Sequence, residues 1–244
     1  MSDKKTPVPA AGAQKAPEKR SAPSEIDAFL RQAKAVAATR AGGGRLILAL
    51  DATMSRQPTW DLACALQAEM FDAVGKAGTL RVQLVYFRGL GECRASKFVS
   101  DTTELKRLMT DISCRGGHTQ IGKVLGHALK ETASAKVDAL VFIGDAMEEQ
   151  LDDLSAKAGN LGLRGVPVFV FQEGRDPIAE RAFKEIARLS KGAWFRFDRS
   201  SAATLARLLS AVAVFATGGL KALETRGRPE DRLMIESMRG GKTG

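Results

Sequence analysis

Three oxygen-bearing side chains follow an apolar run near the start of the chain, at every second position. Residues 46–50 are Leu, Ile or Ala and lead directly into Asp51, after which come Thr53 and Ser55. Such a run is typical of a strand buried on both faces of a parallel sheet, whose ligands bind beyond the carboxyl ends of the strands. One carboxylate and two hydroxyls suit a hard cation such as Mg²⁺. The alternative is a structural turn, in which Asp51 or Ser55 accepts from nearby N–H groups.

Two later stretches carry groups of the same kind. Residues 114–122 place Thr119 in a glycine loop, directly before a segment with helical periodicity. Residues 137–145 form a second apolar run, and this run ends on Asp145. Since Asp51 and Asp145 both end buried-type strands and Thr119 lies in a loop, we expect these groups to face solvent at the carboxyl edge of one sheet.

Together the three stretches resemble the von Willebrand factor A (VWA) domain family, over residues 44–217. The metal-ion-dependent adhesion site (MIDAS) of that family is built from an Asp-x-Ser-x-Ser loop, a distant Thr and a distant Asp. The resemblance assigns five metal-site residues: Asp51, Thr53, Ser55, Thr119 and Asp145. Thr53 stands where the family usually has Ser, and a hydroxyl is kept. Ala146 stands where Gly is common.

The resemblance implies a binding module and not an enzyme. Mg²⁺ (or Mn²⁺) would be bound directly by the hydroxyls, and the two acids would act through bound water. A position left open in the coordination sphere would take an exposed Asp or Glu of a protein partner. Members of the family often work beside AAA+ ATPases or in larger assemblies, so an adaptor role in such an assembly is one expectation.

Composition bounds the class of protein further. The 244 residues are 44% hydrophobic, and 37 Lys and Arg outnumber 28 Asp and Glu, for a net charge of +9. A basic chain can bind acidic partners, nucleic acid included. Nucleic acid is possible but not favoured, because the aromatic residues, 6% of the chain, lie mostly within apolar runs and form no stacking platform.

The cysteines and the hydropathy pattern indicate a cytoplasmic protein. Three scattered cysteines fit neither a disulfide framework nor a Cys-x-x-Cys metal site, so reduced thiols are expected. No apolar leader follows the N-terminal lysines, and no run of 18 uncharged apolar residues occurs. We therefore expect neither a signal peptide nor a membrane span.

The chain divides into four parts by composition. Residues 1–23 hold four of the eight prolines without an apolar period and predict a disordered basic arm. Residues 24–43 predict a helix followed by a Gly linker. Residues 44–217 form the VWA-like domain, and residues 218–244 predict a polar tail with weak helical signals.

Strands and helices alternate through the central part. This alternation predicts an α/β fold, with a doubly wound, mostly parallel, six-stranded sheet and helices on both faces. Residues 92–99 are polar and follow closely spaced glycines, so they predict the one antiparallel edge strand. The strands are expected at residues 46–50, 80–87, 92–99, 138–144, 166–171 and 193–197.

The main enzymatic alternative is a haloacid-dehalogenase-like phosphatase, whose acids lie at comparable strand ends. That family needs Asp-x-Asp-x-Thr, with the second acid as the general acid. Here Thr53 takes that place and cannot donate a proton at neutral pH. A P-loop at residues 240–243 is also disfavoured, because Glu236 stands where its first glycine belongs.

Four further residues have a structural and a functional interpretation. His118 could line the rim of the metal site, although a loop histidine bonded to backbone is the favoured interpretation. Cys114 is interpreted as a loop thiol with no basic partner. Glu148 and Glu149 could set the local charge, but a solvated helix start is the default for them.

Overall fold

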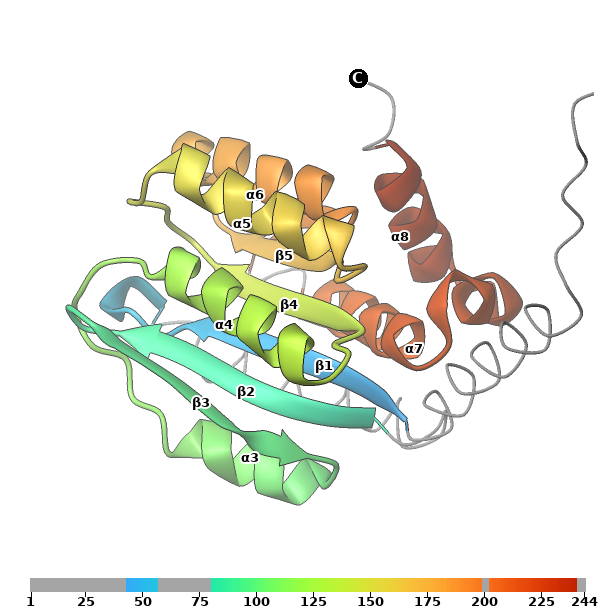
Figure 1. Ribbon diagram of the computed structural model, residues 1–244, viewed down its shortest axis with the longest axis horizontal. Helices are drawn as coiled ribbons and strands as arrows, with labels where there is room; N and C mark the ends of the chain where they lie inside the picture. Colours follow the sequence, from blue (N-terminus) through green and yellow to red (C-terminus); the bar gives the residue numbers. More distant parts are fainter. Residues whose placement is uncertain (1–42, 57–79, 199–201, 241–244) are drawn as a thin grey trace, which may run out of the picture. The chain divides into compact units, whose positions relative to one another are not determined.

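A six-stranded sheet forms the centre of the computed structural model, which describes residues 43–56, 80–198 and 202–240. The strands lie in the order β3-β2-β1-β4-β5-β6 (Figure 1). They span Gly44–Asp51 (β1), Leu80–Arg88 (β2), Glu92–Val99 (β3), Ala139–Gly144 (β4), Val168–Glu173 (β5) and Ala193–Phe197 (β6). The arm predicted at 1–23 and the helix predicted within 24–43 lie outside the described residues. So does residue range 57–79, where Pro58 followed by apolar residues at helical spacing predicts a further helix.

The pairing of the strands confirms the predicted doubly wound sheet. β1 pairs in parallel with both β2 and β4, and β4–β5 and β5–β6 are also parallel. β3 alone runs antiparallel, against β2 at the edge. β1 lies in the middle of the sheet, with β2 and β3 added on one side of it and β4, β5 and β6 on the other. The order therefore reverses between β1 and β4, and it is at such a point that this class of fold binds ligands.

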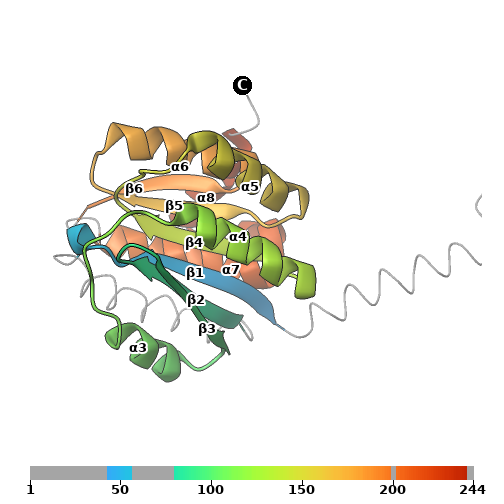
Figure 2. The ribbon, with the colours of Figure 1, turned by 60° about the vertical axis from the view of Figure 1, so that its left-hand side comes forward.

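Helices cover both faces of the sheet (Figure 2). One face packs against α4, α5 and α6, and the other against α3, α7 and α8. Within β1, Ile47 and Ala49 face the first layer, whereas Leu46, Leu48 and Leu50 face the second, which explains why its apolar run is unbroken. The helices span Thr102–Thr110 (α3), Ile121–Ser134 (α4), Leu151–Leu163 (α5), Pro177–Ser190 (α6), Ala202–Arg226 (α7) and Pro229–Gly240 (α8).

The C-terminal segment differs from the predicted polar tail. α7 continues past residue 217, bends where Gly219 has a φ of 67°, and is followed by α8. Leu223, Met234 and Ile235 from this segment join the core. The sequence does not indicate this packing, because the three apolar residues lie among many polar and charged ones. Moreover Asp231, which suggests an exposed helix start, is fully buried against Arg226.

α7 is long and apolar enough to cross a membrane, by length and composition alone, over Ala203–Arg226. Buried helices of soluble folds pass the same test. In this structure Leu205, Leu209 and Val212 are buried in the core between the helix and the sheet. The apolar character of α7 is therefore accounted for by its packing on the sheet.

Candidate metal centre

Asp51 ends β1 and is fully buried. Its Oδ1 accepts a hydrogen bond of 2.8 Å from the backbone N–H of Thr53. Its Oδ2 is buried and has no hydrogen-bond partner among the described residues. The pKa of Asp51 is raised to about 6: burial, the largest cause, and the charge of Asp145 raise it, while hydrogen bonds from Thr53 and the charge of Arg56 act to lower it. Burial therefore outweighs the positive charge of Arg56, and the ionised carboxylate of Asp51 is incompletely compensated.

Asp145 comes from the neighbouring strand. It directly follows Gly144, the last residue of β4, and the two strands run side by side up to the pair Leu50–Ile143. A Cβ placed on Gly144 would lie 3.5 Å from the Cβ of Asp51, so the two strand ends are in contact. The Oδ1 of Asp145 is also buried without a hydrogen-bond partner in the described part of the chain. Two adjacent strands thus each supply one carboxylate oxygen that no described donor satisfies.

The predicted hydroxyls lie in the loop after β1. Thr53 is buried and Ser55 is exposed, and their hydroxyl oxygens are 3.0 Å apart. Residues 54–56 form one short 3-10 turn, η1 (Met54–Arg56), closed by a 3.0 Å bond from the N–H of Arg56 to the carbonyl of Thr53. This turn keeps both hydroxyls close to the end of β1.

The glycine loop is joined to the same place by backbone contacts. The N–H of Arg115 donates to the carbonyl of Ala52 at 3.0 Å, and Arg115 pairs with Thr53 as an isolated parallel bridge. On its other side the loop contacts the β2–β3 turn, where the N–H of His118 donates to the carbonyl of Gly89 at 3.3 Å. The structure therefore gathers the three stretches that carry the five predicted residues at the carboxyl end of β1 and β4.

Thr119 is buried, and its polar atoms are bonded to Glu148. The Thr119 N–H donates to Oε2 of Glu148, and the Glu148 N–H donates to Oγ1 of Thr119, both at 3.0 Å. This reciprocal pair ties the glycine loop to the segment after β4. The hydroxyl of Thr119 keeps a second lone pair, so coordination of a cation remains open to it.

The acids at 148 and 149 and the histidine at 118 differ from their favoured interpretations. Glu149 does not lie at the start of α5. It accepts from the N–H groups of Ile121 and Gly122, the latter at 2.9 Å, at the N-terminus of α4. The His118 side chain is exposed, and its Nδ1 lies 3.3 Å from Oε2 of Glu148 and not against backbone.

Arg56 was not among the residues predicted for the site. Its side chain is only 1% exposed, it pairs with Glu173 at the end of β5, and its guanidinium lies 5.8 Å from the ring centre of Phe197. Burial lowers the pKa of Arg56, whereas the charges of Asp145 and Asp51 raise it. An arginine directly after Ser55 looks like an exposed loop residue in the sequence. Only the tertiary structure shows that it supplies positive charge beside the two acids.

These donors fit a hard divalent cation. Such ions prefer oxygen ligands, and every predicted residue offers one. Within the described ranges no three His, Cys, Asp or Glu side chains gather closely enough to hold a metal, so a cation here would depend on the hydroxyls of Thr53, Ser55 and Thr119. When bound, the cation would supply positive charge to the two carboxylates and an open position for an oxygen ligand.

Solved structures share this fold, although no family model and no curated protein matches the sequence. The SpRpn10 VWA domain superposes with a TM-score of 0.54 and 13% identity, over 72% of this chain and 97% of that chain. An aerotolerance-related membrane protein from Bacteroides fragilis gives 0.52 and 22%, over 67% and 96%. Proximal thread matrix protein 1 from the mussel byssus, in a structure whose MIDAS motif is occupied by zinc, gives 0.53 and 18%, over 72% and 46%.

These likenesses establish the fold of a VWA domain for this chain. They confirm the resemblance read from Asp51, Thr119 and Asp145 at the level of architecture. The metal site of this chain stays a prediction.

Proposed function

We propose that this chain is a VWA-type interaction module that binds a divalent cation and, through it, an acidic residue of a protein partner. The supporting observation is the pair of buried carboxylate oxygens on Asp51 and Asp145, neither bonded to a described donor, at the ends of adjacent strands. Leaving one buried carboxylate oxygen unsatisfied is unfavourable by about 1–3 kcal/mol or more. A bound cation, together with the waters that it orients, would remove that penalty.

The five residues have two different roles, depending on whether the side chain is charged. Thr53, Ser55 and Thr119 can bind Mg²⁺ or Mn²⁺ without neutralising it, while Asp51 and Asp145 supply the compensating charge. Three hydroxyls fall short of the six oxygens that Mg²⁺ prefers, so water or a partner completes the sphere. Ser55 is exposed, which leaves that side open to a partner carboxylate. The cytoplasm is the compartment we propose, in keeping with Cys93 and Cys114, which are free thiols in the structure.

The geometry gives less support to the alternative function, a haloacid-dehalogenase-like phosphatase. In that reading the position of Thr53 must hold a general acid, yet it is a hydroxyl 3.0 Å from that of Ser55. We expect no phosphate-ester hydrolysis above background. Robust turnover that disappears in Asp51→Asn would favour the enzyme instead.

Metal binding is tested by thermal stability. Mg²⁺ at about 100 times its Kd should add about 2.7 kcal/mol to the unfolding free energy and raise the melting temperature. Asp51→Asn and Thr119→Ala should abolish the rise. Thr110→Ala is the control, because Thr110 is an exposed threonine of α3 whose hydroxyl donates to backbone carbonyls of its own helix. Equal Mg²⁺ binding by all variants in calorimetry would contradict the site.

Partner binding is tested with the whole protein as bait. A partner captured from lysate in Mg²⁺ should be released by EDTA, and Ser55→Ala should weaken the complex about as much as EDTA does. A partner retained equally in EDTA and by Ser55→Ala would show that the docking surface lies elsewhere.

A further inference from the structure

A cluster of arginines beside the candidate site carries more positive than negative charge. Arg88 and Arg94 each place Nε 2.9 Å from the carboxylate of Glu92, and Nη1 of Arg115 lies 3.9 Å from it. Three guanidinium groups thus share one carboxylate in the ion pairs described. Arg88, which is largely buried, also donates to the carbonyl of Ser113 at 2.7 Å. We call Arg88, Arg94 and Arg115 the arginine rim.

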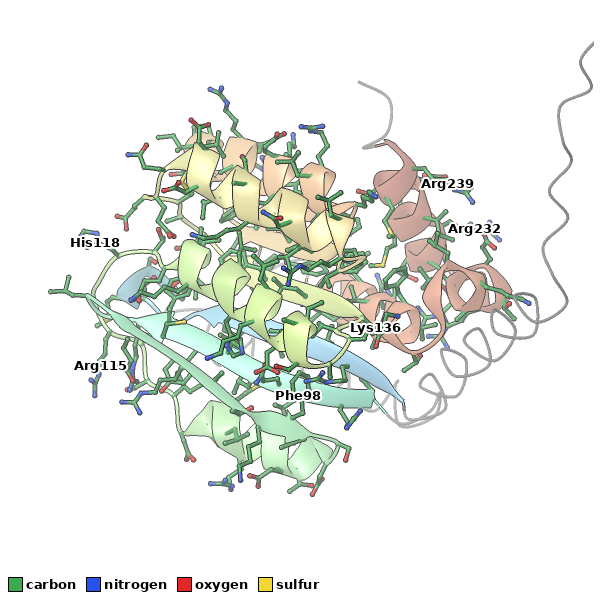
Figure 3. All side chains as sticks on the ribbon, in the orientation of Figure 1. Phe98, Arg115, His118, Lys136, Arg232 and Arg239 are labelled. Atoms are coloured by element: carbon green, nitrogen blue, oxygen red, sulfur yellow. The ribbon has the colours of Figure 1, made fainter. Side chains whose placement is uncertain are left out.

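The arginine rim borders the candidate metal site. The backbone of Arg115 bonds to Ala52, between Asp51 and Thr53. The hairpin that carries Arg88 and Arg94 contacts the glycine loop through the bond from His118 to Gly89. Figure 3 shows Arg115 and His118 at one end of the sheet, near the tip of the β2–β3 hairpin. A ligand held at Asp51 and Thr53 therefore has the arginine rim on its β2–β3 side.

The outer arginines are accessible, and apolar side chains lie near them. The side chains of Arg94 and Arg115 are 71% and 62% exposed. Leu90, at the turn between β2 and β3, is 85% exposed, and Met54, between the two predicted hydroxyl ligands, is 54% exposed. Exposed arginine with exposed large apolar groups is typical of a protein-binding surface.

Two acids lie next to the site, on the segment between β4 and α5. Glu148 is half exposed and accepts from the Thr119 N–H, whereas Glu149 accepts from N–H groups at the start of α4. Glu148 repels an acidic side chain, and the exposed Arg94 and Arg115 attract one. A partner with a second acid would therefore place it at the arginine rim and not beside Glu148.

We propose that the arginine rim binds a second acidic side chain of the partner, so that the ligand is a protein segment with two acidic residues. One residue would occupy the metal site, and the other would pair with Arg94 and Arg115. This inference rests on the proposed function for its first contact. Planar guanidinium groups bind carboxylates through paired hydrogen bonds, which makes a carboxylate the matching ligand for the rim.

The test uses fluorescein-labelled peptides with two Asp residues separated by one to four Gly. Extended chain advances about 3.5 Å per residue, so the series spans roughly 7–17 Å between the acids. In each matched peptide Asn replaces the second Asp. By fluorescence anisotropy in Mg²⁺, the best two-acid peptide should bind wild type about two- to fivefold tighter than its one-acid match.

Arg94→Gln and Arg115→Gln, singly and together, should remove this advantage while leaving affinity for the one-acid peptide nearly unchanged. Arg107→Gln is the matched control, because Arg107 is an equally exposed arginine on α3, bonded to Glu104. An advantage that persists in the double variant would overturn the inference, as would equal binding of the two peptides by wild type. Stronger competition by a duplex oligonucleotide than by the two-acid peptide would also overturn it, in favour of nucleic acid.

Failure of the proposed function gives a different result. Calorimetry with Mg²⁺ alone reports the metal site without any peptide. If Mg²⁺ does not bind, and the two-acid peptide still binds more tightly than its one-acid match in EDTA, the metal site is disproved and the arginine rim is supported. If Mg²⁺ binds and EDTA releases both peptides, but no arginine variant changes the ratio of the two peptide affinities, the metal site is supported and the role of the arginine rim is disproved.

Discussion

At the residue scale, the carboxyl of Asp51 has two charged neighbours that act in opposite directions. Asp145 disfavours its ionisation and Arg56 favours it, while burial raises its pKa to about 6. The ordinary value is 3.8. Metal-free protein therefore holds a proton on Asp51 over a pH range in which the unfolded chain has already released it.

This difference predicts how stability depends on pH. Because the folded pKa is the higher one, the folded state binds more protons between about pH 4 and 6, and the unfolding free energy contributed by Asp51 falls as pH rises through that window. The loss should total about 2–3 kcal/mol at most and level off above pH 6. Urea unfolding without metal measures it. Asp51→Asn should flatten this part of the curve, and saturating Mg²⁺ should reverse its sign. A decline of the same size in Asp51→Asn would assign it to other groups.

Arg56 should oppose cation binding, since its charge lies beside both acids. Arg56→Met alone would remove the ion pair with Glu173, whose side chain is only 16% exposed, and should lower stability by about 3–5 kcal/mol. Arg56→Met combined with Glu173→Gln removes both charges and should fold more stably than the single variant. In calorimetry this double variant should bind Mg²⁺ about tenfold more tightly than wild type. Glu173→Gln alone is the control, and unchanged affinity in the double variant would show that Arg56 does not oppose the cation.

At the scale of elements, the apolar pattern of the sequence was sufficient to predict the strands of the sheet but not the packing of the C-terminal helices. Each strand is a dense apolar run or, for β3, a polar run between turn signals, and all six predicted strands are present. α3 ends at Thr110, two residues before Ile112, which is nonetheless buried. In α8, two buried apolar residues among charged neighbours give too weak a period to reveal packing.

The packing of α8 can be measured with two adjacent residues. Met234 is fully buried in the core, whereas Leu233 is 51% exposed on the same helix. Met234→Ala should lower the unfolding free energy by about 2–5 kcal/mol, because it leaves a cavity. Leu233→Ala should change it by less than about 0.5 kcal/mol. Equal, small effects in denaturant unfolding would mean that the segment is the loose polar tail that its composition suggests.

The candidate site was predictable in its strand ends and loop but not in its supporting contacts. Asp51, Thr53, Ser55, Thr119 and Asp145 could be named because the resemblance to the VWA family assigns them, at strand ends and in a glycine loop. Their role as metal ligands stays a prediction. The partners of Glu148, Glu149 and Arg56 could not be named. Each is a choice among several polar groups that the chain brings together only in three dimensions, and exposed and buried charges look alike in a sequence.

At the scale of the whole molecule, the excess of positive charge affects how fast charged partners approach the protein. The net charge is +9, and residues 1–42 hold eight Lys and Arg against four Asp and Glu. Part of the excess therefore lies outside the domain that carries the candidate site. Such charge accelerates encounter with acidic partners in general and gives little selectivity among them.

The rates of binding should separate this general attraction from the metal contact. For the two-acid peptide, raising KCl from 50 to 500 mM should slow association about tenfold, because the Debye length shortens from about 14 to 4 Å. Dissociation should change much less with salt, because it requires breaking short-range contacts at the site. Asp51→Asn should instead accelerate dissociation and leave association nearly unchanged, since it alters a single buried group. Stopped-flow anisotropy measures both rates. If salt and Asp51→Asn both acted only on association, binding would be governed by the basic exterior, and the candidate site would have no part in holding the partner.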